Sequence, residues 1–562
     1  MKKYISFLVC AIMMMTLITG CSGKPETTGT VTETGTPEPS VTETDPITEE
    51  TTEPVTTEPQ ETLPVVTEDE EAMKAEPASS FTVSRAFGDG MILQRNEYIR
   101  IWGWADDSQN GKRVEAEFSG LHGAAVIENG EWMLTLGGTL PECTEGKQLR
   151  VFGADGTEYK YEDVLVGDVY WVIGQSNVWY PVSYIKNEPL ANEKGRNAEI
   201  SNELQIRLNR TFAGDFAGID IGTDAVSRDV VNKRGWQKPE QGAMDFSALG
   251  YFNALMIYEQ LERKVPVGMI EFDGNGCALH AFLPNKVRDD LQVSKLSGGH
   301  YTAAGANAHV SSFMYNHGMY SFRKMPIRGI LWYQGESDLQ TANDNCTKYA
   351  ERFTALIKYL RDDHDQLNHD YPVYIVELPP IFIAFDFAAV RDNMGLIPTM
   401  LDEAYICTTS DLWSDRTYNK DAVRNSLHPY NKWEISERMS AMILAHDDGI
   451  GELDQLCGPQ IDKIELSEDR QTVTLTYKYT GGGLKSDSAL KGFKVKTEKK
   501  TSWAKPASME ITGENTVVIK ANAPITQVAY ETQRDDTFPK NLTLSSGTGI
   551  PAGAFSFPFP AE

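Results

Sequence analysis

Ser176 occupies a position in which a side-chain hydroxyl can act as a nucleophile. It stands in a Gly-Gln-Ser-Asn turn, residues 174–177, directly after the apolar run Val-Tyr-Trp-Val-Ile at 169–173. Five consecutive β-branched or aromatic residues predict a strand that is buried on both faces. In an open α/β sheet the strand ends form the ligand crevice, and a helix that begins after the turn directs N–H groups at a bound anion. The alternative is a turn followed by a helix N-cap, without any chemistry.

Three later stretches supply the other groups that a serine nucleophile needs, which are a base and donors for an oxyanion. Residues 272–277, Phe-Asp-Gly-Asn-Gly-Cys, form a Gly-rich turn after a predicted strand, where the N–H of Gly276 can face a ligand. Residues 331–338 repeat this layout and add Gln334 and Glu336. The Gln334 amide can donate to an oxyanion, or it can simply tie down a loop. His428 stands in a Pro-bounded loop before a predicted helix, although a lone histidine is more often structural.

Between residues 166 and 457, strand-like runs alternate with longer helical patterns. This alternation predicts an α/β fold with a parallel sheet covered by helices. The expected strands are 169–173, 267–272, 327–333, 373–378 and 404–409, and the expected helices are 246–262, 345–363 and 432–445. On either side the chain has short runs of period two, which predict an N-terminal β-sandwich domain at 81–165 and a C-terminal β domain at 458–562.

The amino terminus has the layout of a bacterial secretory signal peptide. Lys2 and Lys3 precede an apolar run, and Leu-Ile-Thr-Gly at 17–20 precedes Cys21. These residues resemble a lipobox, which implies cleavage after residue 20 and a lipid on the Cys21 sulfur; the alternative is an ordinary signal peptide with an incidental cysteine. Residues 21–80 are rich in Thr, Glu and Pro and predict a disordered tether. We therefore expect a membrane-anchored lipoprotein at the cell surface, facing outward.

Charge and cysteine usage exclude several classes of protein. The formal net charge is −28, and no basic cluster appears anywhere, which argues against nucleic acid as a partner. The cysteines are scattered and lack any C-x-x-C pair, so the sequence indicates neither a disulfide framework nor a zinc site. Apart from a lipid at Cys21, the sequence offers no contact with a membrane.

The motifs together resemble the sialate O-acetylesterase family within the SGNH hydrolases. The resemblance is carried by Gly-Gln-Ser-Asn at 174–177, Trp-Tyr-Gln-Gly-Glu-Ser at 332–337 and His-Pro-Tyr-Asn-Lys at 428–432, and it covers roughly residues 82 to 558. It implies an SGNH-hydrolase-like parallel sheet with helices on both faces, flanked by the two β domains.

The resemblance also implies a role for each candidate residue. Ser176 would be the nucleophile and His428 the general base and acid. The N–H groups of Ser176 and Gly276, with the Gln334 side chain, would form the oxyanion hole, and Glu336 would lie in the same pocket. The implied substrate is an O-acetylated glycan, hydrolysed through an acetyl-serine intermediate without a metal or an organic cofactor.

The sequence departs from the family pattern in two places. Val178-Trp179 follows the nucleophile turn, where the family usually carries Met-type packing. The family also has an aspartate two or three residues before the histidine, and here Asn425 and Ser426 occupy that region. Loss of such an acid can lower the rate by about 10⁴ where nothing replaces it. The candidates to replace it are Asp421, Asp411 and Glu336.

Two other functions fit the same sequence. One is an acetyl xylan or acetyl mannan esterase of the same family. The other is a non-catalytic glycan-binding protein derived from this fold, suggested by the missing aspartate, the flanking β domains and the aromatic residues Trp179 and Trp413.

Overall fold

The computed structural model describes residues 71–295, 310–338, 346–364, 366–378, 387–412, 427–530 and 543–560. All of them belong to one unit of the chain, Pro64–Glu562. The expected signal peptide, Cys21 and most of the tether lie outside the described residues, as do Trp413, Asp421, Asn425 and Ser426. Within the described ranges, no helix combines the length and apolarity needed to cross a bilayer.

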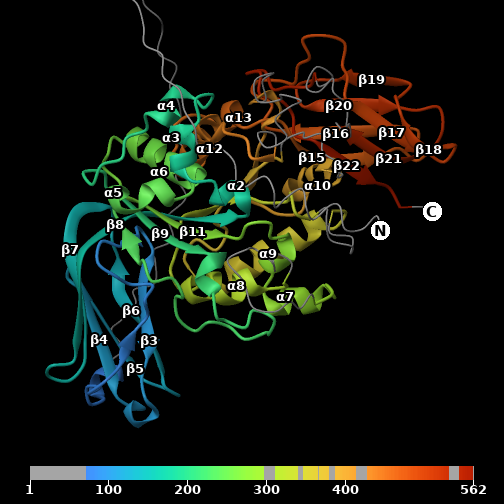
Figure 1. Cartoon of the computed structure of the whole chain (residues 1–562). Coiled ribbons are helices and arrows are strands. Elements are labelled where there is room, and N and C mark those ends of the chain that lie inside the picture. The colour runs from blue at the N-terminus through green and yellow to red at the C-terminus, as the bar shows by residue number, and fades with distance from the viewer. Residues whose placement is uncertain are drawn as a thin grey trace, which may run out of the picture. The chain divides into compact units, whose positions relative to one another are not determined.

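A mixed α/β layer carries the candidate site residues (Figure 1). The strand order of its sheet is β10-β9-β11-β8-β12-β13-β14. Neighbouring strands from β9 to β14 are parallel, and β10 is antiparallel to β9. The strands are β8 (Glu158–Gly174), β9 (Ile206–Phe212), β10 (Trp236–Gln237), β11 (Val267–Asp273), β12 (Gly329–Tyr333), β13 (Val373–Val376) and β14 (Ala404–Cys407).

Helices lie on both faces of this sheet. Helices α6 (Ala248–Gln260) and α12 (Lys432–Asp447) pack together on one face, and α8 (Phe313–His317) and α9 (Tyr349–His364) lie on the other (Figure 1). The other α-helices of the described ranges are α2 (Ser176–Trp179), α3 (Val182–Asn187), α4 (Glu193–Arg196), α5 (Pro239–Gly242), α7 (Asn285–Asp290), α10 (Phe387–Met394) and α13 (Leu453–Leu456). The expected α/β fold is therefore confirmed, and each of the five expected strands and three expected helices is present.

The interior of the sheet explains why β8 forms its centre. All five residues from Val169 to Ile173 have no exposed surface, as the apolar run predicts. Burying one such side chain contributes about 1.5–3 kcal/mol. The Trp171 ring packs edge-on against Phe272 of β11, with centroids 5.0 Å apart. On β12 the Trp332 indole is also fully buried and donates to the Tyr349 hydroxyl at 3.0 Å, so its one polar atom is satisfied.

β-sheet regions precede and follow the α/β layer. The N-terminal strands form a β1-β3-β6 sheet and a β5-β4-β7 group that joins the first part of β8, and β2 pairs with β8 in parallel. They are β1 (Thr82–Val83), β2 (Ile92–Gln94), β3 (Tyr98–Trp104), β4 (Arg113–Phe118), β5 (Leu121–Val126), β6 (Glu131–Thr139) and β7 (Cys143–Phe152). Because β8 runs through residues 165 and 166, the N-terminal sheet and the central sheet share one strand. The proposed division into domains at 81–165, 166–457 and 458–562 stays a prediction.

The C-terminal region consists of two four-stranded antiparallel sheets, β15-β16-β20-β19 and β18-β17-β21-β22. Their strands are β15 (Gln460–Leu466), β16 (Thr472–Lys478), β17 (Phe493–Thr497), β18 (Lys500–Ala504), β19 (Ser508–Ile511), β20 (Thr516–Lys520), β21 (Ile525–Tyr530) and β22 (Phe555–Pro558). In β16 and β20, buried apolar residues alternate with more exposed ones, as the period-two pattern predicts.

Strand β9 was not expected from the sequence, because polar residues occupy its buried positions. Arg207, Asn209 and Thr211 are each at most 1% exposed. The Asn232 amide donates to the side-chain oxygens of Asn209 and Thr211, at 3.0 and 2.9 Å. Only a tertiary partner makes such a strand stable inside a sheet.

Candidate active site

The turns after β8, β11 and β12 meet at one edge of the sheet, because these three parallel strands end at the same level. Gly174 at the end of β8 is in register with Asp273 of β11 and Tyr333 of β12. The N–H of Gly274 donates to the Gly174 carbonyl at 3.1 Å. A Cβ atom on Gly174 would lie 2.1 Å from the Tyr333 carbonyl oxygen, so only glycine fits where the chain turns toward Ser176.

Ser176 and His428 are hydrogen-bonded to each other. Ser176 is the first residue of α2, and its Oγ lies 2.8 Å from Nε2 of His428. His428 lies in the loop that leads into α12, so 252 residues separate the two partners. The Tyr180 ring stacks on the imidazole with centroids 6.4 Å apart and an interplanar angle of 26°. The structure therefore brings together the two residues that the sequence analysis predicted to react.

The surroundings of His428 keep its imidazole uncharged at neutral pH. Burial disfavours the imidazolium ion, and the nearby Lys432 ammonium repels it; together they lower the pKa of His428 from 6.5 to about 4. In the tautomer protonated on Nδ1, the neutral imidazole has a free lone pair on Nε2, which can accept the proton of the Ser176 hydroxyl.

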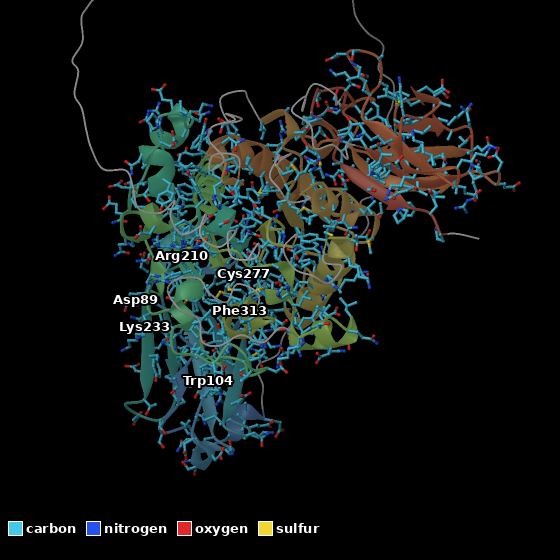
Figure 2. All side chains as sticks on the ribbon, turned by 45° about the vertical axis from the view of Figure 1, so that its right-hand side comes forward. Asp89, Trp104, Arg210, Lys233, Cys277 and Phe313 are labelled. Carbon is cyan, nitrogen blue, oxygen red and sulfur yellow. The ribbon has the colours of Figure 1, made fainter. Side chains whose placement is uncertain are left out.

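Two backbone N–H groups stand where an oxyanion hole was expected. Those of Ser176 and Gly276 donate to no acceptor among the described residues. Gly276 has φ +70°, a conformation that favours glycine, in the turn that follows β11. Cys277, the next residue, is fully buried in the interior (Figure 2). These groups are available to a ligand, and their role as oxyanion donors stays a prediction.

The Gln334 amide is engaged with protein groups. Its Nε2 lies within hydrogen-bond reach of Gln175 Oε1 at 3.2 Å, the Cys277 carbonyl at 3.1 Å and Asp338 Oδ2 at 2.6 Å, and the side chain is fully buried. Two amide hydrogens are thus shared among three acceptors. These contacts favour the tie-down role, in which Gln334 links the turns after β8, β11 and β12. An oxyanion role, which stays a prediction, requires one of these bonds to be given up.

The candidate acids have other partners in the part of the chain that the structure describes. Both carboxylate oxygens of Asp411 accept from the Arg438 guanidinium, at 2.8 and 2.7 Å. Glu336 is 3% exposed and accepts from the Asn177 side chain. Its pKa is raised to about 7 by burial, against the effects of the Asn177 hydrogen bond and the Lys432 charge. Neither carboxylate forms a described hydrogen bond with His428, so the identity of the orienting acid stays a prediction, with Asp421 as the third candidate.

The sequence analysis missed the polar residues that hold the site together. Gln175 and Asn177, which flank Ser176, are 3% and 0% exposed. Gln175 Oε1 accepts from the Ser337 N–H at 3.1 Å, and its Nε2 donates to the Ser337 Oγ at 3.1 Å. Lys432, the first residue of α12, is also fully buried. A signal was present in the sequence, because two amides directly beside a nucleophile on a buried turn need partners.

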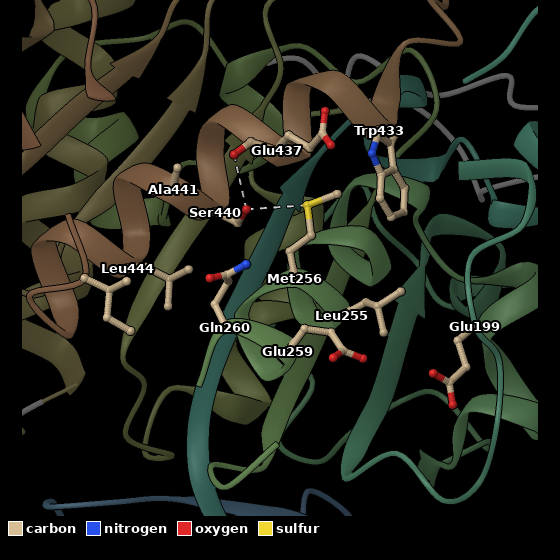
Figure 3. Close-up of a pocket in the computed structure, with 11 residues that line it drawn as sticks. Glu199, Leu255, Met256, Glu259, Gln260, Trp433, Glu437, Ser440, Ala441 and Leu444 are labelled. Carbon is tan, nitrogen blue, oxygen red and sulfur yellow. Dashed lines mark hydrogen bonds between the residues drawn. The ribbon is translucent and has the colours of Figure 1, made fainter. Parts of the chain in front are cut away.

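A groove of about 500 Å³ between α6 and α12 lies apart from these residues (Figure 3). Trp433, Glu437 and Ser440 of α12 line it, and the Ser440 hydroxyl contacts the Met256 sulfur at 3.4 Å. None of the candidate catalytic residues lines this groove. Helix α12 thus carries Lys432 on the side of the site and Trp433 on the side of the groove.

A serine hydroxyl at the carboxyl edge of a parallel sheet, hydrogen-bonded to a neutral histidine, is the arrangement of serine hydrolases on α/β scaffolds. In the described residues, no group of three or more His, Cys, Asp or Glu side chains is arranged to hold a metal ion.

The known proteins to which this chain is similar are carbohydrate esterases. Residues 236–417 match the family model of carbohydrate esterases described as sialic acid-specific acetylesterase. The matched range includes Gly276, Gln334 and Glu336 and excludes Ser176 and His428.

Curated relatives and a solved structure agree with the family. The chain is 24% identical to the sialate O-acetylesterases of Pongo abelii and Homo sapiens over 376 residues, which are 62% of this chain and 66% of each relative. It is 21% identical to the sialate O-acetylesterase of Mus musculus over 440 residues, which are 70% of this chain and 77% of that relative. The crystal structure of a carbohydrate acetylesterase from Xanthomonas citri has a TM-score of 0.65 at 21% identity, covering 85% of this chain and 99% of that one. This structural likeness shows that the fold is shared.

Proposed function

We propose that the protein hydrolyses O-acetyl esters of sugars, with O-acetylated sialic acid as its substrate. The observation that carries the proposal is the 2.8 Å contact between Ser176 Oγ and Nε2 of His428, whose pKa is low enough to leave it neutral. The match of residues 236–417 to the carbohydrate esterase model supports an ester as the substrate, and the names of the curated relatives support the sialate ester in particular.

The first half of the reaction forms an acetyl-enzyme. Ser176 Oγ attacks the acetyl carbonyl carbon while its proton moves to His428 Nε2, and the carbonyl oxygen becomes an oxyanion. The N–H groups of Ser176 and Gly276 donate to that oxyanion; one such donor typically contributes about 10²–10³ in rate. As the intermediate collapses, His428 returns the proton to the departing sugar oxygen, and the acetyl group stays on Ser176.

The second half releases acetate. His428 takes a proton from a water molecule, and the resulting hydroxide attacks the acetyl-serine carbonyl. The same donors stabilise the second oxyanion. The proton then passes from His428 to Ser176 Oγ, which restores the resting enzyme, so that one water is consumed for each acetate and sugar hydroxyl formed.

The test is acetate release from O-acetylated sialic acid by the chain from residue 71 onward, with the Ser176→Ala and His428→Ala variants as controls. We expect release by the parent protein and near-complete loss in both variants. Equal release from all three proteins would refute the assigned roles. Parallel assays on acetylated xylan and acetylated mannan test the substrate, because faster release there would transfer the function to plant polysaccharide. Glycan binding without turnover of p-nitrophenyl acetate would support the non-catalytic alternative.

The proposal places this enzyme outside the cell, held at the membrane by a lipid on Cys21. Its support is the signal-like sequence before Cys21 and the Thr-, Glu- and Pro-rich segment that follows. Radiolabelled palmitate should be incorporated into the full chain in a bacterial host and should be absent from the Cys21→Ser variant. Equal incorporation in both would overturn the assignment of Cys21.

A further inference from the structure

Behind Ser176 and His428 lies a buried polar cluster to which the proposed reaction assigns no part. It consists of Asn177, Glu336 and Lys432, which are 0%, 3% and 0% exposed. Lysine is almost never fully buried unless it is paired, because desolvating an ammonium ion is costly. A buried lysine next to a nucleophile therefore needs an explanation.

Lys432 and Asn177 each donate a hydrogen bond to a backbone carbonyl of the His428 loop. Lys432 Nζ donates to the Pro429 carbonyl at 2.8 Å and to Asn177 Oδ1 at 2.8 Å. Asn177 Nδ2 donates to the Leu427 carbonyl at 3.0 Å and also to Glu336 Oε1. Leu427 and Pro429 are the residues on either side of His428. Asn177 is the residue after Ser176, so the cluster joins the chain beside the nucleophile to the chain on both sides of the histidine.

The cluster is balanced in charge and enclosed by aromatic rings. The Lys432 ammonium lies 5.1 Å from the ring centroids of both Tyr180 and Tyr333, where the negative faces of the rings attract a cation. Burial lowers the pKa of Lys432 to about 7, while the Glu336 carboxylate acts in the opposite direction. Burial likewise raises the pKa of Glu336 to about 7. The two groups therefore compensate each other, and Lys432 keeps at least two N–H donors whether or not it is charged.

We infer that Lys432, acting through Asn177 and the Pro429 carbonyl, is a positioning residue that holds His428 within hydrogen-bonding distance of Ser176 Oγ. This inference rests on the proposed esterase function. Lys432 touches neither the substrate nor the transferred proton. Its contribution is to fix the loop on both sides of the base, because misplacing a catalytic group by about 1 Å can cost roughly 10²-fold in rate.

The inference is tested with Lys432→Met, which keeps most of the side-chain volume and removes the donors. Lys186→Met is the matched control, because Lys186 Nζ likewise makes two hydrogen bonds, to the backbone carbonyls of Arg196 and Ala198 at 3.1 and 3.0 Å, outside the His428 loop. For p-nitrophenyl acetate we expect kcat of Lys432→Met to fall by about 10- to 100-fold with KM changed less than about twofold. The control should keep kcat within about twofold.

A second variant keeps the test valid if the single substitution prevents folding. Glu336→Gln/Lys432→Met removes both charges together, and replacing a buried pair in this way is often tolerated. Its kcat should remain about tenfold or more below that of the parent. Asn177→Ala should reproduce the loss in kcat. The kcat of the Asn177→Ala/Lys432→Met protein should lie within about threefold of that of the slower single variant, because both substitutions break the same connection.

The pH profile separates positioning from general stabilisation. Lys432 faces the His428 imidazole together with Tyr180, and its charge lowers the pKa of His428. In Lys432→Met the acid limb of kcat/KM should therefore move to higher pH, which a purely structural role would not cause. A folded Lys432→Met protein with kcat within twofold of the parent and an unchanged acid limb would overturn the inference.

Failure of the inference is distinguishable from failure of the proposed function. Acetate release by the parent protein tests the function. The relative rate at which diethyl p-nitrophenyl phosphate phosphorylates Ser176 tests the inference without turnover of any acetyl ester. We expect labelling of Lys432→Met to be slower by about the same factor as its kcat. Labelling as fast as in the parent would overturn the positioning role, whatever the substrate.

Discussion

The low pKa of His428 predicts an unusually acid-tolerant esterase. The test compares the dependence of kcat/KM on pH in the parent protein, in Tyr180→Ala and in Tyr180→Phe. The Tyr180 ring stacks on the imidazole, with the ring centroids 6.4 Å apart. Removing the ring should hydrate the imidazolium ion and raise the pKa of His428, whereas Tyr180→Phe keeps the ring and serves as the matched control.

The magnitude follows from the two pKa values. The pKa of His428 is lowered from 6.5 to about 4. At pH 5 about nine-tenths of the imidazole is then neutral, compared with about 3% for a histidine at its ordinary value. The parent should therefore keep nearly full kcat/KM at pH 5 and lose about tenfold per pH unit below about pH 4. In Tyr180→Ala the midpoint should lie between about 4 and 6.5, because Lys432 still repels the imidazolium ion.

The assay is initial-rate hydrolysis of p-nitrophenyl acetate, followed as acetate release because the nitrophenol product changes its absorbance with pH. Circular dichroism at each pH shows that a loss of rate is not unfolding. A midpoint near 6.5 in the folded parent would refute the argument from burial. An unchanged midpoint in Tyr180→Ala would show instead that the Tyr180 ring does not control hydration of His428.

Three further predictions concern the scaffold. Gln334→Leu should lower the free energy of unfolding by about 1–3 kcal/mol in urea titrations, because it leaves buried acceptors without donors. Unchanged stability together with a kcat lower by a factor of about 10²–10³ would favour the oxyanion role instead. Burial opposes protonation of His446, but its bonds to Asp447 and Glu403, at 2.6 and 2.7 Å, raise its pKa to about 9. This stabilisation is complete below about pH 6.5 and is lost as the pH rises through about 9, so His446→Gln should remove part of the decrease in melting temperature across that range. Gly174→Ala should abolish activity and lower the melting temperature, because its Cβ would meet a carbonyl oxygen of β12. Gly88→Ala is the control and should be tolerated, because no atom lies closer than 3.9 Å to the added Cβ. Equal melting temperatures of the two variants would contradict the steric argument.

The sequence predicted the central sheet well where the strands are apolar. The runs that became β8, β11 and β12 are continuous and buried, and their pattern needs no tertiary information. Strand β9 escaped prediction because its buried residues include Arg207, Asn209 and Thr211, whose partners come from distant segments. The extent of β8 escaped as well, since a strand that passes from one sheet into another has no signal of its own at the junction.

In the candidate site, too, the sequence predicted some features and others depend on tertiary contacts. Ser176 and His428 were identified from residue type, position after a strand and resemblance to a family, and the structure brings them to 2.8 Å. The engagement of Gln334 with three acceptors depends on where the other turns lie. Lys432 carried no sequence signal of burial, because a lysine at the start of a helix is ordinarily exposed.

By itself, then, the sequence determined the apolar strands of the core, and it predicted which side chains take part in the proposed acetyl transfer. These properties are local, because they depend on hydrophobic periodicity and on the functional group of each residue. Only the tertiary structure decided how Ser176 meets a histidine 252 residues away, and which buried amides and amine hold the two together. Hydrogen bonding between distant turns is set by the register of the sheet, and no short stretch of sequence encodes that register.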